Sequence, residues 1–557
     1  MKAAGAFTKI KVDGEIRLGG RHELVQAPRA SPTDVFVTRS GGSALDYDTR
    51  SANADDALGQ ILEFRFSDRP VGDLAIRGAG LVTSFGIFGS PGSGKTVLLM
   101  HLLEQLLRHS PDLPEKRFGG LILDPKAALI EDVTEMVARA GRSEDLVVIN
   151  TDRLEQVGGA DDVNVIDCLV DPQELGSILV LAGRSAGIDA SDPFWFQEWS
   201  NLFAATLSCL RAQAFLEMSV GGPRPVTLKD LLDAIFEEED GERRIQRIAR
   251  SLADRAAKLP PRSTPRWPGV PAAPDVKVDL QLLDRFFRQD YVGTIEAFIS
   301  KAFGMFRRSR LACYSRAQRP GQLPFYEDLI ENGRIVLVSV SPSEPGLAKT
   351  LCTLVKCLFQ RTVLARGDRL TSGTMTNAVR PLVLACDEYS EIASEVPGQS
   401  MGDGQFLALA RQYGCMALLA TQSVNVLQAS SLKESWRSVF SNFAAKIYMR
   451  LADNETAEEA TKLAGESDWK VLSRGSSIGK DGASSSKQRE LRERKNLPST
   501  ILTQVLKTGE AVVIGSLDGG RTTPGTYFLK VPPPGPKPEA AARSAPATVS
   551  AGAASHA

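Results

Sequence analysis

The chain has 557 residues, of which 43% are hydrophobic and 24% are charged, and its formal net charge is −1. This length predicts two or three domains, because single hydrophobic cores stop growing at about 250–300 residues. The balanced charge gives no overall attraction to nucleic acid, so a DNA contact would require a local basic surface. Seven cysteines without a CxxC pair and only four histidines disfavour disulfide frameworks, zinc sites and histidine-based catalysis.

The sequence shows neither a secretory leader nor an apolar run of about 18 residues, which a membrane span would need. We therefore expect a cytoplasmic protein, at most peripheral to the inner membrane. Residues 1–75 have no assigned role, although alternating stretches such as residues 34–38 indicate strands.

From residue 76 onward, buried strands alternate with helices. Strands are predicted at residues 81–88, 120–123 and 146–150, and an apolar-faced helix at residues 97–107. Such alternation indicates a mainly parallel sheet covered by helices on both faces. The fold class predicted is α/β, and residues 76–185 form the first part of a nucleotide-binding domain.

Between the first strand and this helix lies a phosphate-binding pattern, G-x-x-x-x-G-K-[ST]. Its residues are Gly89, Ser90, Pro91, Gly92, Ser93, Gly94, Lys95 and Thr96. In such a loop the glycines let backbone N–H groups converge on phosphate oxygens, while the lysine approaches the β- and γ-phosphates and the hydroxyl binds Mg²⁺. The pattern therefore predicts ATP and Mg²⁺ as cofactors, with Lys95 and Thr96 in these two roles.

Residues 186–325 have a different character, with helical patterns and almost no strand signals. A capping box at Thr227 and Asp230 marks the start of one of these helices. We interpret this region as an all-α domain inserted into the α/β domain, which resumes at residues 326–530.

Two basic stretches in this helical region are candidates for contact with nucleic acid. Arg243, Arg244, Arg247, Arg250 and Arg255 follow an acidic run, which favours a solvated and ion-paired helix face. The second stretch interleaves with aromatic residues, which leaves a DNA contact open; its arginines are Arg307, Arg308, Arg310, Arg316 and Arg319.

A buried strand at residues 381–386 ends in Asp387 and Glu388. P-loop chemistry needs an acid at the end of a neighbouring strand to hold the metal ion and its waters. We therefore assign Asp387 to Mg²⁺ and Glu388 to polarising the attacking water. The long separation from Lys95 requires a large insertion, which the helical region supplies.

Gln422 ends the next buried strand, at residues 416–422, where it is predicted to sense the γ-phosphate. Ring ATPases also use an arginine from a neighbouring subunit to stabilise transition-state charge. Arg411, Arg437 and Arg450 are candidates, and Arg411 is our choice. Farther on, residues 475–488 are predicted to be a mobile Gly/Ser-rich loop, the last strand lies near residues 511–514, and the Pro/Ala-rich tail at 531–557 is predicted to be disordered.

Taken in order, these features resemble the type IV coupling proteins of conjugation and type IV secretion, the TraD/TraG-like members of the FtsK–HerA superfamily. The resemblance extends over residues 76–530 and includes the strand ending in Asp124-Pro125-Lys126. Its most specific part covers residues 381–465, with Arg411-Gln412-Tyr413-Gly414, Ala420-Thr421-Gln422-Ser423, Asn442-Phe443-Ala444-Ala445-Lys446-Ile447-Tyr448, Asp453-Asn454-Glu455-Thr456-Ala457 and Leu463-Ala464-Gly465.

The resemblance implies a RecA-like motor that assembles as a homo-hexamer and hydrolyses ATP to drive a relaxase-bound DNA strand, or protein substrates, into a type IV secretion channel. Its partners would be single-stranded DNA, a relaxase or secreted protein, and channel components. Many members begin with transmembrane anchors, which this sequence does not show, so a separate membrane partner is one expectation. Two alternatives stay open: an FtsK/HerA-type double-stranded DNA translocase, and a nucleotide-binding adaptor without hydrolysis.

Overall fold

The computed structural model describes residues 10–532, with gaps at residues 11, 29–61, 68, 151–162, 186–191, 219–222, 261–270, 290–291, 309–321, 342, 396–401, 480–481 and 522–523. The strand-like residues 34–38, the arginines at 310, 316 and 319, and nearly all of the C-terminal tail therefore lie outside the described residues. Among the described helices, none combines the length and the hydrophobicity that a membrane crossing requires.

An 11-stranded sheet forms the centre of the molecule. Its strands lie in the order β4 (Gly72–Arg77), β1 (Glu15–His22), β17 (Gly525–Lys530), β16 (Glu510–Gly515), β13 (Ala445–Met449), β5 (Ser84–Phe88), β12 (Cys415–Thr421), β11 (Leu382–Cys386), β6 (Gly119–Asp124), β10 (Ile335–Ser339) and β7 (Leu146–Ile149). The pairs from β13 to β7 are parallel, whereas those from β13 back to β4 are antiparallel. The predicted mainly parallel α/β fold is confirmed.

Both faces of the parallel part are buried, as its continuously apolar strands require. In β12, for example, every residue is buried; Ala417 and Leu419 join one apolar core, while Met416, Leu418 and Ala420 join the other. This split follows from the two-residue period of a strand.

Helices on the two faces complete these cores. The face lined by Met416 and Leu418 packs against α2 (Lys95–Leu107) and α3 (Ile130–Arg139). The opposite face packs against α11 (Phe325–Asn332), α12 (Pro345–Leu364) and α14 (Asp403–Leu409). Shorter helices complete this part of the fold: α13 (Arg366–Ser372), α15 (Val424–Ala429), α16 (Trp436–Ser441) and α17 (Asn454–Ala464).

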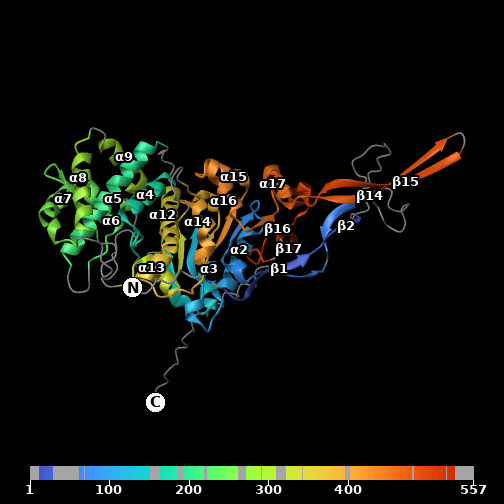
Figure 1. Cartoon of the computed structure of the whole chain (residues 1–557), viewed down its shortest axis with the longest axis horizontal. Helices are drawn as coiled ribbons and strands as arrows, with labels where there is room; N and C mark the ends of the chain where they lie inside the picture. The colour runs from blue at the N-terminus through green and yellow to red at the C-terminus, as the bar shows by residue number, and fades with distance from the viewer. Residues whose placement is uncertain are drawn as a thin grey trace, which may run out of the picture.

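A group of helices lies at one end of the molecule, on the left in Figure 1. It comprises α4 (Pro172–Ser185), α5 (Pro193–Leu216), α6 (Leu228–Phe236), α7 (Arg244–Arg255), α8 (Ala273–Phe286) and α9 (Val292–Arg308), with a small hairpin of β8 (Glu238–Glu239) and β9 (Glu242–Arg243). Aromatic stacking contributes to its core: the Trp199 and Phe298 rings lie parallel with centroids 3.6 Å apart. The predicted all-α addition to the sheet is confirmed.

Two local predictions for this group are also confirmed. Thr227 and Asp230 form a reciprocal capping box at the start of α6. On α7, Arg244, Arg247 and Arg250 pair with Glu237, Glu239 and Glu242 respectively. This basic face is therefore occupied by ion pairs with the preceding acidic run.

The sheet extends farther than predicted at both ends of the chain. Within residues 1–75, β1 and the first residues of β4 join the main sheet, and β2 (Leu24–Pro28) pairs with β3 (Leu62–Phe66). After the strand expected near 511–514, a further strand, β17, pairs with both β16 and β1. The prediction that β16 would be the last strand was therefore wrong. β17, which reads GTYFLK, is short and lies between loop-forming residues, so its sequence did not stand out as a strand.

The prediction of a loop was also wrong for residues 475–479 and 482–488, while residues 480–481 lie outside the described residues. This stretch lies within a long antiparallel hairpin, β14 (Glu466–Gly479) and β15 (Gly482–Lys495), which extends from the body in Figure 1. Gly and Ser are poor strand formers, and that composition suggested a loop. The register runs from Glu466 opposite Lys495 to Gly479 opposite Gly482, so backbone pairing is continuous along the hairpin.

Candidate nucleotide site

The strand order brings the predicted site residues to one edge of the sheet. The P-loop follows β5, Gln422 follows β12, the Asp387-Glu388 pair follows β11, and Asp124-Pro125-Lys126 ends β6. These four strands are neighbours in the sheet and run parallel, so their carboxyl ends meet at the same edge. Ligands of open α/β sheets bind at this edge.

The P-loop curls around the side chain of its own lysine. Lys95 Nζ donates to the carbonyl oxygens of Gly89 at 2.7 Å and Ser90 at 3.4 Å. Gly94 precedes α2 with a φ of +107°, a conformation that favours glycine, and a Cβ atom there would lie 3.1 Å from Met449 Cε. Burial lowers the pKa of Lys95, although the nearby carboxylates of Glu388 and Asp387 oppose this shift.

Thr96 and Asp387 are in direct contact, as a shared magnesium site would require. Thr96 Oγ1 donates to Asp387 Oδ2 at 2.7 Å, and the other carboxylate oxygen, Oδ1, is buried without a hydrogen-bond partner. Burial raises the pKa of Asp387, while the hydrogen bond from Thr96 opposes that rise. A hydroxyl beside an unpartnered carboxylate oxygen fits Mg²⁺, which prefers oxygen ligands.

Glu388 is held between two side chains from the neighbouring strands. Lys126 Nζ lies 2.7 Å from Glu388 Oε1, and Gln422 Nε2 donates to Glu388 Oε2 at 3.2 Å. The Glu388 backbone adopts a φ of +59°, which is uncommon for a residue other than glycine. Such conformations persist where the surroundings over-determine them, often at functional sites.

Residues from the C-terminal third of the chain also fasten the P-loop. The backbone N–H and the hydroxyl of Ser90 both donate to the Arg450 carbonyl, at 2.8 and 2.9 Å. Gly509 N–H donates to the Ser93 carbonyl at 3.0 Å, and Thr508 Oγ1 donates to the Gly92 carbonyl at 3.2 Å. β13, which pairs with β5, and β16, which pairs with β13, thus supply contacts to the P-loop from the segments at their ends.

The structure does not bring Arg411 to this edge within one chain. Arg411 is exposed in the turn before β12 begins, at the end of that strand opposite Gln422. Arg437 lies over the Trp436 ring, with its guanidinium carbon 5.0 Å from the centroid. Of the three arginine candidates, only Arg450 contacts the P-loop, and it does so through its carbonyl group. Arg411 as a trans-acting finger stays a prediction.

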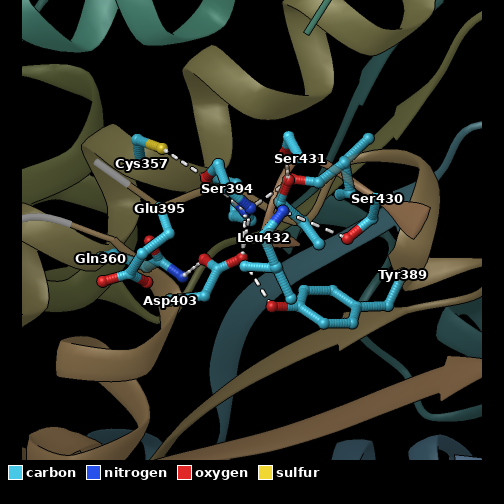
Figure 2. A network of polar contacts seen from close by, with 12 residues as sticks. Cys357, Gln360, Tyr389, Ser394, Glu395, Asp403, Ser430, Ser431 and Leu432 are labelled. Atoms are coloured by element: carbon cyan, nitrogen blue, oxygen red, sulfur yellow. Dashed lines mark hydrogen bonds and ion pairs between the residues drawn. The ribbon is translucent and has the colours of Figure 1, made fainter. Parts of the chain in front are cut away.

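A buried polar network lies just beyond Glu388 (Figure 2). Asp403 Oδ2 accepts hydrogen bonds from the Tyr389 hydroxyl at 2.6 Å and from the Ser394 N–H at 2.9 Å, and Gln360 Nε2 donates to Asp403 Oδ1 at 2.8 Å. Lys356 Nζ completes the network 2.6 Å from Asp403 Oδ2; the two side chains are 1% and 2% exposed. This network ties the segment after Glu388 to α12 and α14.

Sequence reasoning missed three parts of the site. Lys126 entered only as part of a family resemblance, although a lysine just past the end of a buried strand was visible. The contacts of Thr508 and Gly509 had no signal, because they depend on backbone groups. The buried partner of Asp403, Lys356, lies in an apolar helix, where an isolated lysine was the available clue.

The chain was compared with protein families, with curated proteins and with solved structures. Residues 381–505 match the family described as the TraM recognition site of TraD and TraG, while no curated protein matches the chain. Its fold is similar to that of the plasmid coupling protein TrwB in complex with the ATP analogue ADPNP, at 12% identity and a TM-score of 0.51. The TrwB complex with the GTP analogue GDPNP gives 14% identity and a TM-score of 0.50. Each comparison covers 82% of this chain and 86% of the TrwB chain.

At such identities the likeness to TrwB concerns the fold: a mostly parallel sheet with helices on both faces and an added all-α group. The family match covers β11, β12, β13 and the hairpin β14–β15. It also covers Asp387 and Glu388, which follow β11, and Gln422, which follows β12. The chain thus combines a fold similar to that of TrwB with a segment, residues 381–505, that matches the TraM recognition site of TraD and TraG.

Proposed function

We propose that this chain is an ATP-hydrolysing coupling protein, which recruits DNA bound to a relaxase, or protein substrates, and drives them into a type IV secretion channel. The observation that carries the proposal is the convergence of the P-loop, the Thr96–Asp387 contact and Glu388 at one sheet edge. The TraD and TraG family match supports the coupling role.

Each side chain has a separate task in this proposal. Backbone N–H groups of residues 89–96 and the Lys95 ammonium bind the phosphates, and Thr96 with Asp387 holds Mg²⁺, which would neutralise phosphate charge. Glu388 orients the attacking water, and Gln422, which contacts Glu388 directly, reports the state of the γ-phosphate. Arg411, exposed on the surface, would act on the site of a neighbouring copy in a homo-hexamer.

We further infer a division of labour along the chain. Residues 76–185 and 326–530 form the motor domain and residues 186–325 form the inserted helical domain, while α4 (Pro172–Ser185) packs against both α5 and α12 where the two meet. The roles of residues 1–75 and 531–557 stay unassigned. The family description names TraM, so residues 381–505 are the segment to test for a partner that docks the motor onto the secretion machinery. Such a partner would also supply the membrane attachment.

ATP turnover of the purified chain, measured with and without single-stranded DNA, tests the proposal. We expect hydrolysis that DNA stimulates, and we expect Glu388→Gln to retain ATP binding while losing at least a hundredfold in turnover. Glu391→Gln is the matched control, because Glu391 lies three residues away in an exposed ion pair with Lys349.

The alternatives give different results in the same assay. Stimulation by naked duplex together with translocation along it would favour the FtsK/HerA-type pump. Nucleotide binding without turnover in the folded wild type would contradict the proposal and favour the adaptor. Equal turnover in wild type and Glu388→Gln would show that Glu388 is misassigned.

A further inference from the structure

Lys126 is the half-exposed cation at the nucleotide edge whose present partner is the proposed catalytic carboxylate. We propose that Lys126 exchanges partners: it binds Glu388 when no γ-phosphate is present, and it binds the terminal phosphate of a nucleoside triphosphate when one is. This exchange would free Glu388 only when a hydrolysable nucleotide is bound. The inference rests on the proposed nucleotide site, although its test requires binding alone and not hydrolysis.

The carboxylate of Glu388 is held from two sides. Both of its carboxylate oxygens are occupied, Oε1 by Lys126 at 2.7 Å and Oε2 by Gln422 at 3.2 Å. A carboxylate that orients water must offer an oxygen to that water. A carboxylate has about four lone-pair sites, so a water could still bind, but the Lys126 ammonium competes with it at Oε1 and offsets the charge that would polarise it.

Of the two residues in this ion pair, Lys126 is better able to leave. Its side chain is 52% exposed, whereas that of Glu388 is 11% exposed. A lysine has a flexible stem and a compact ammonium group that rotates among acceptors, so it can change partners without a backbone movement. Glu388, by contrast, is fixed by its left-handed backbone and by Tyr389, which is anchored to Asp403.

The turn that carries Lys126 is held by hydrogen bonds at the end of β6, beside the site. Asp124 Oδ2 accepts hydrogen bonds from the Leu129 N–H at 2.7 Å and from the Ser339 hydroxyl at 2.9 Å, and Ala127 has a φ of +52°. A turn held in an uncommon conformation by buried hydrogen bonds indicates that the position of its side chains matters.

The charge of Lys126 also acts on Lys95. Burial is the main cause that lowers the pKa of Lys95, and the charge of Lys126 lowers it further, so the two ammonium groups share one local field. The carboxylates of Asp387 and Glu388 offset this pair of cations in the structure described. Added phosphate charge would give Lys126 a second anion to pair with, in direct competition with Glu388.

Two variants separate this exchange from a purely structural role. Lys126→Met keeps the length of the side chain and removes its charge, while Lys126→Arg keeps the charge. Affinity is measured for ADP and for a non-hydrolysable ATP analogue, both with Mg²⁺. We expect Lys126→Met to weaken analogue binding at least tenfold and ADP binding less than twofold, and we expect Lys126→Arg to restore most of the loss. Lys349→Met, which removes the partner of Glu391, should change neither affinity.

A double-mutant cycle sharpens the test. If Glu388 competes for Lys126, Glu388→Gln should tighten analogue binding several-fold in the wild-type background and should have no such effect in the Lys126→Met background. Equal losses for both nucleotides in Lys126→Met, or no loss for either, would overturn the exchange. Failure of the wild-type chain to bind any nucleotide would instead refute the proposed function, so the two outcomes are distinguishable.

Discussion

Thr96 and Asp387 are separated by 291 positions in the chain, and yet the hydroxyl of one donates to the carboxylate of the other at 2.7 Å. The helical group lies between them in sequence but at one end of the molecule in space (Figure 1). Because the contact joins β11 to α2, it can form only when the two separated parts of the sheet have assembled. The hydrogen bond is therefore a direct link between correct folding and the proposed metal site.

The first prediction concerns this contact. Asp387→Asn keeps the shape of the side chain but removes the charge that would bind Mg²⁺, so nucleotide affinity should fall at least tenfold with Mg²⁺ and change little when the metal is chelated. Titration of Mg²⁺ against nucleotide binding measures this difference. Asp368→Asn, an exposed position on α13, is the control. The same loss with and without metal would contradict the assignment.

The second prediction concerns the buried pair of Lys356 and Asp403. Asp403→Ala leaves a buried ammonium group without its carboxylate, which should lower the free energy of unfolding by ~3–5 kcal/mol. The control is Glu391→Ala, which breaks a more exposed ion pair between α12 and the turn after Glu388 and should cost less than about 1 kcal/mol. Denaturant midpoints of the two variants are compared with the wild type. Similar losses in both would show that burial of the pair is unimportant.

The third prediction concerns Glu327, which is fully buried and has one carboxylate oxygen without a hydrogen-bond partner. Burial raises its pKa from 4.5 to about 7. Between these values the folded chain keeps a proton that the unfolded chain releases, so stability falls as pH rises through this window, by up to about 1.4 kcal/mol per pH unit. Below pH 4.5 this contribution is fully present, and above pH 7 it is lost.

Glu327→Gln should flatten this part of the pH dependence, because glutamine does not titrate. Melting temperatures at intervals between pH 5 and pH 8 measure the slope. A smaller slope of the same sign should persist, since burial also raises the pKa of Asp167, to about 6. Glu144→Gln, an exposed position, should retain the wild-type slope. An unchanged slope in Glu327→Gln would contradict the assignment.

The fourth prediction concerns Gly509, which has a φ of +81° and donates to the P-loop carbonyl of Ser93. Gly509→Ala should cost about 1–2 kcal/mol of stability, because a Cβ atom is disfavoured in this backbone conformation. It should also weaken nucleotide binding by displacing Ser93. Gly373→Ala is the matched control, since Gly373 has a φ of +74° with no atom near the added Cβ and ends α13. Equal nucleotide affinity in both variants would show that Gly509 does not support nucleotide binding.

Much of the fold followed from sequence because the parallel strands are continuous apolar runs ending in polar residues. The strand before Asp387 and Glu388 is one such run, and its membership of the same parallel sheet as the P-loop strand was predictable, although β12 lies between the two strands. The antiparallel edge was harder. β1 and β17 pair across almost the whole length of the chain, and neither carries an apolar run long enough to reveal that partnership.

The site was predictable where chemistry depends on a side chain in a known pattern, as for Lys95 and Thr96. It was not predictable where the decisive group is a backbone atom or a distant partner. The backbone carbonyl of Arg450 accepts a hydrogen bond from Ser90, and it would do so whatever side chain residue 450 carried. The sequence therefore offers no signal for this contact. The pairing of Lys126 with Glu388 required the order of the strands, which only the three-dimensional fold supplies.

The placement of β5 at the centre of the sheet has a consequence for the biogenesis of the protein. β5 ends at Phe88, but its two neighbours begin only at Cys415 and Ala445. A ribosome adding about 5–20 residues per second would need roughly a quarter of a minute to a minute to reach them. Throughout that time the nascent chain presents an unpaired apolar strand, so efficient production in a cell should depend on chaperones that act during translation.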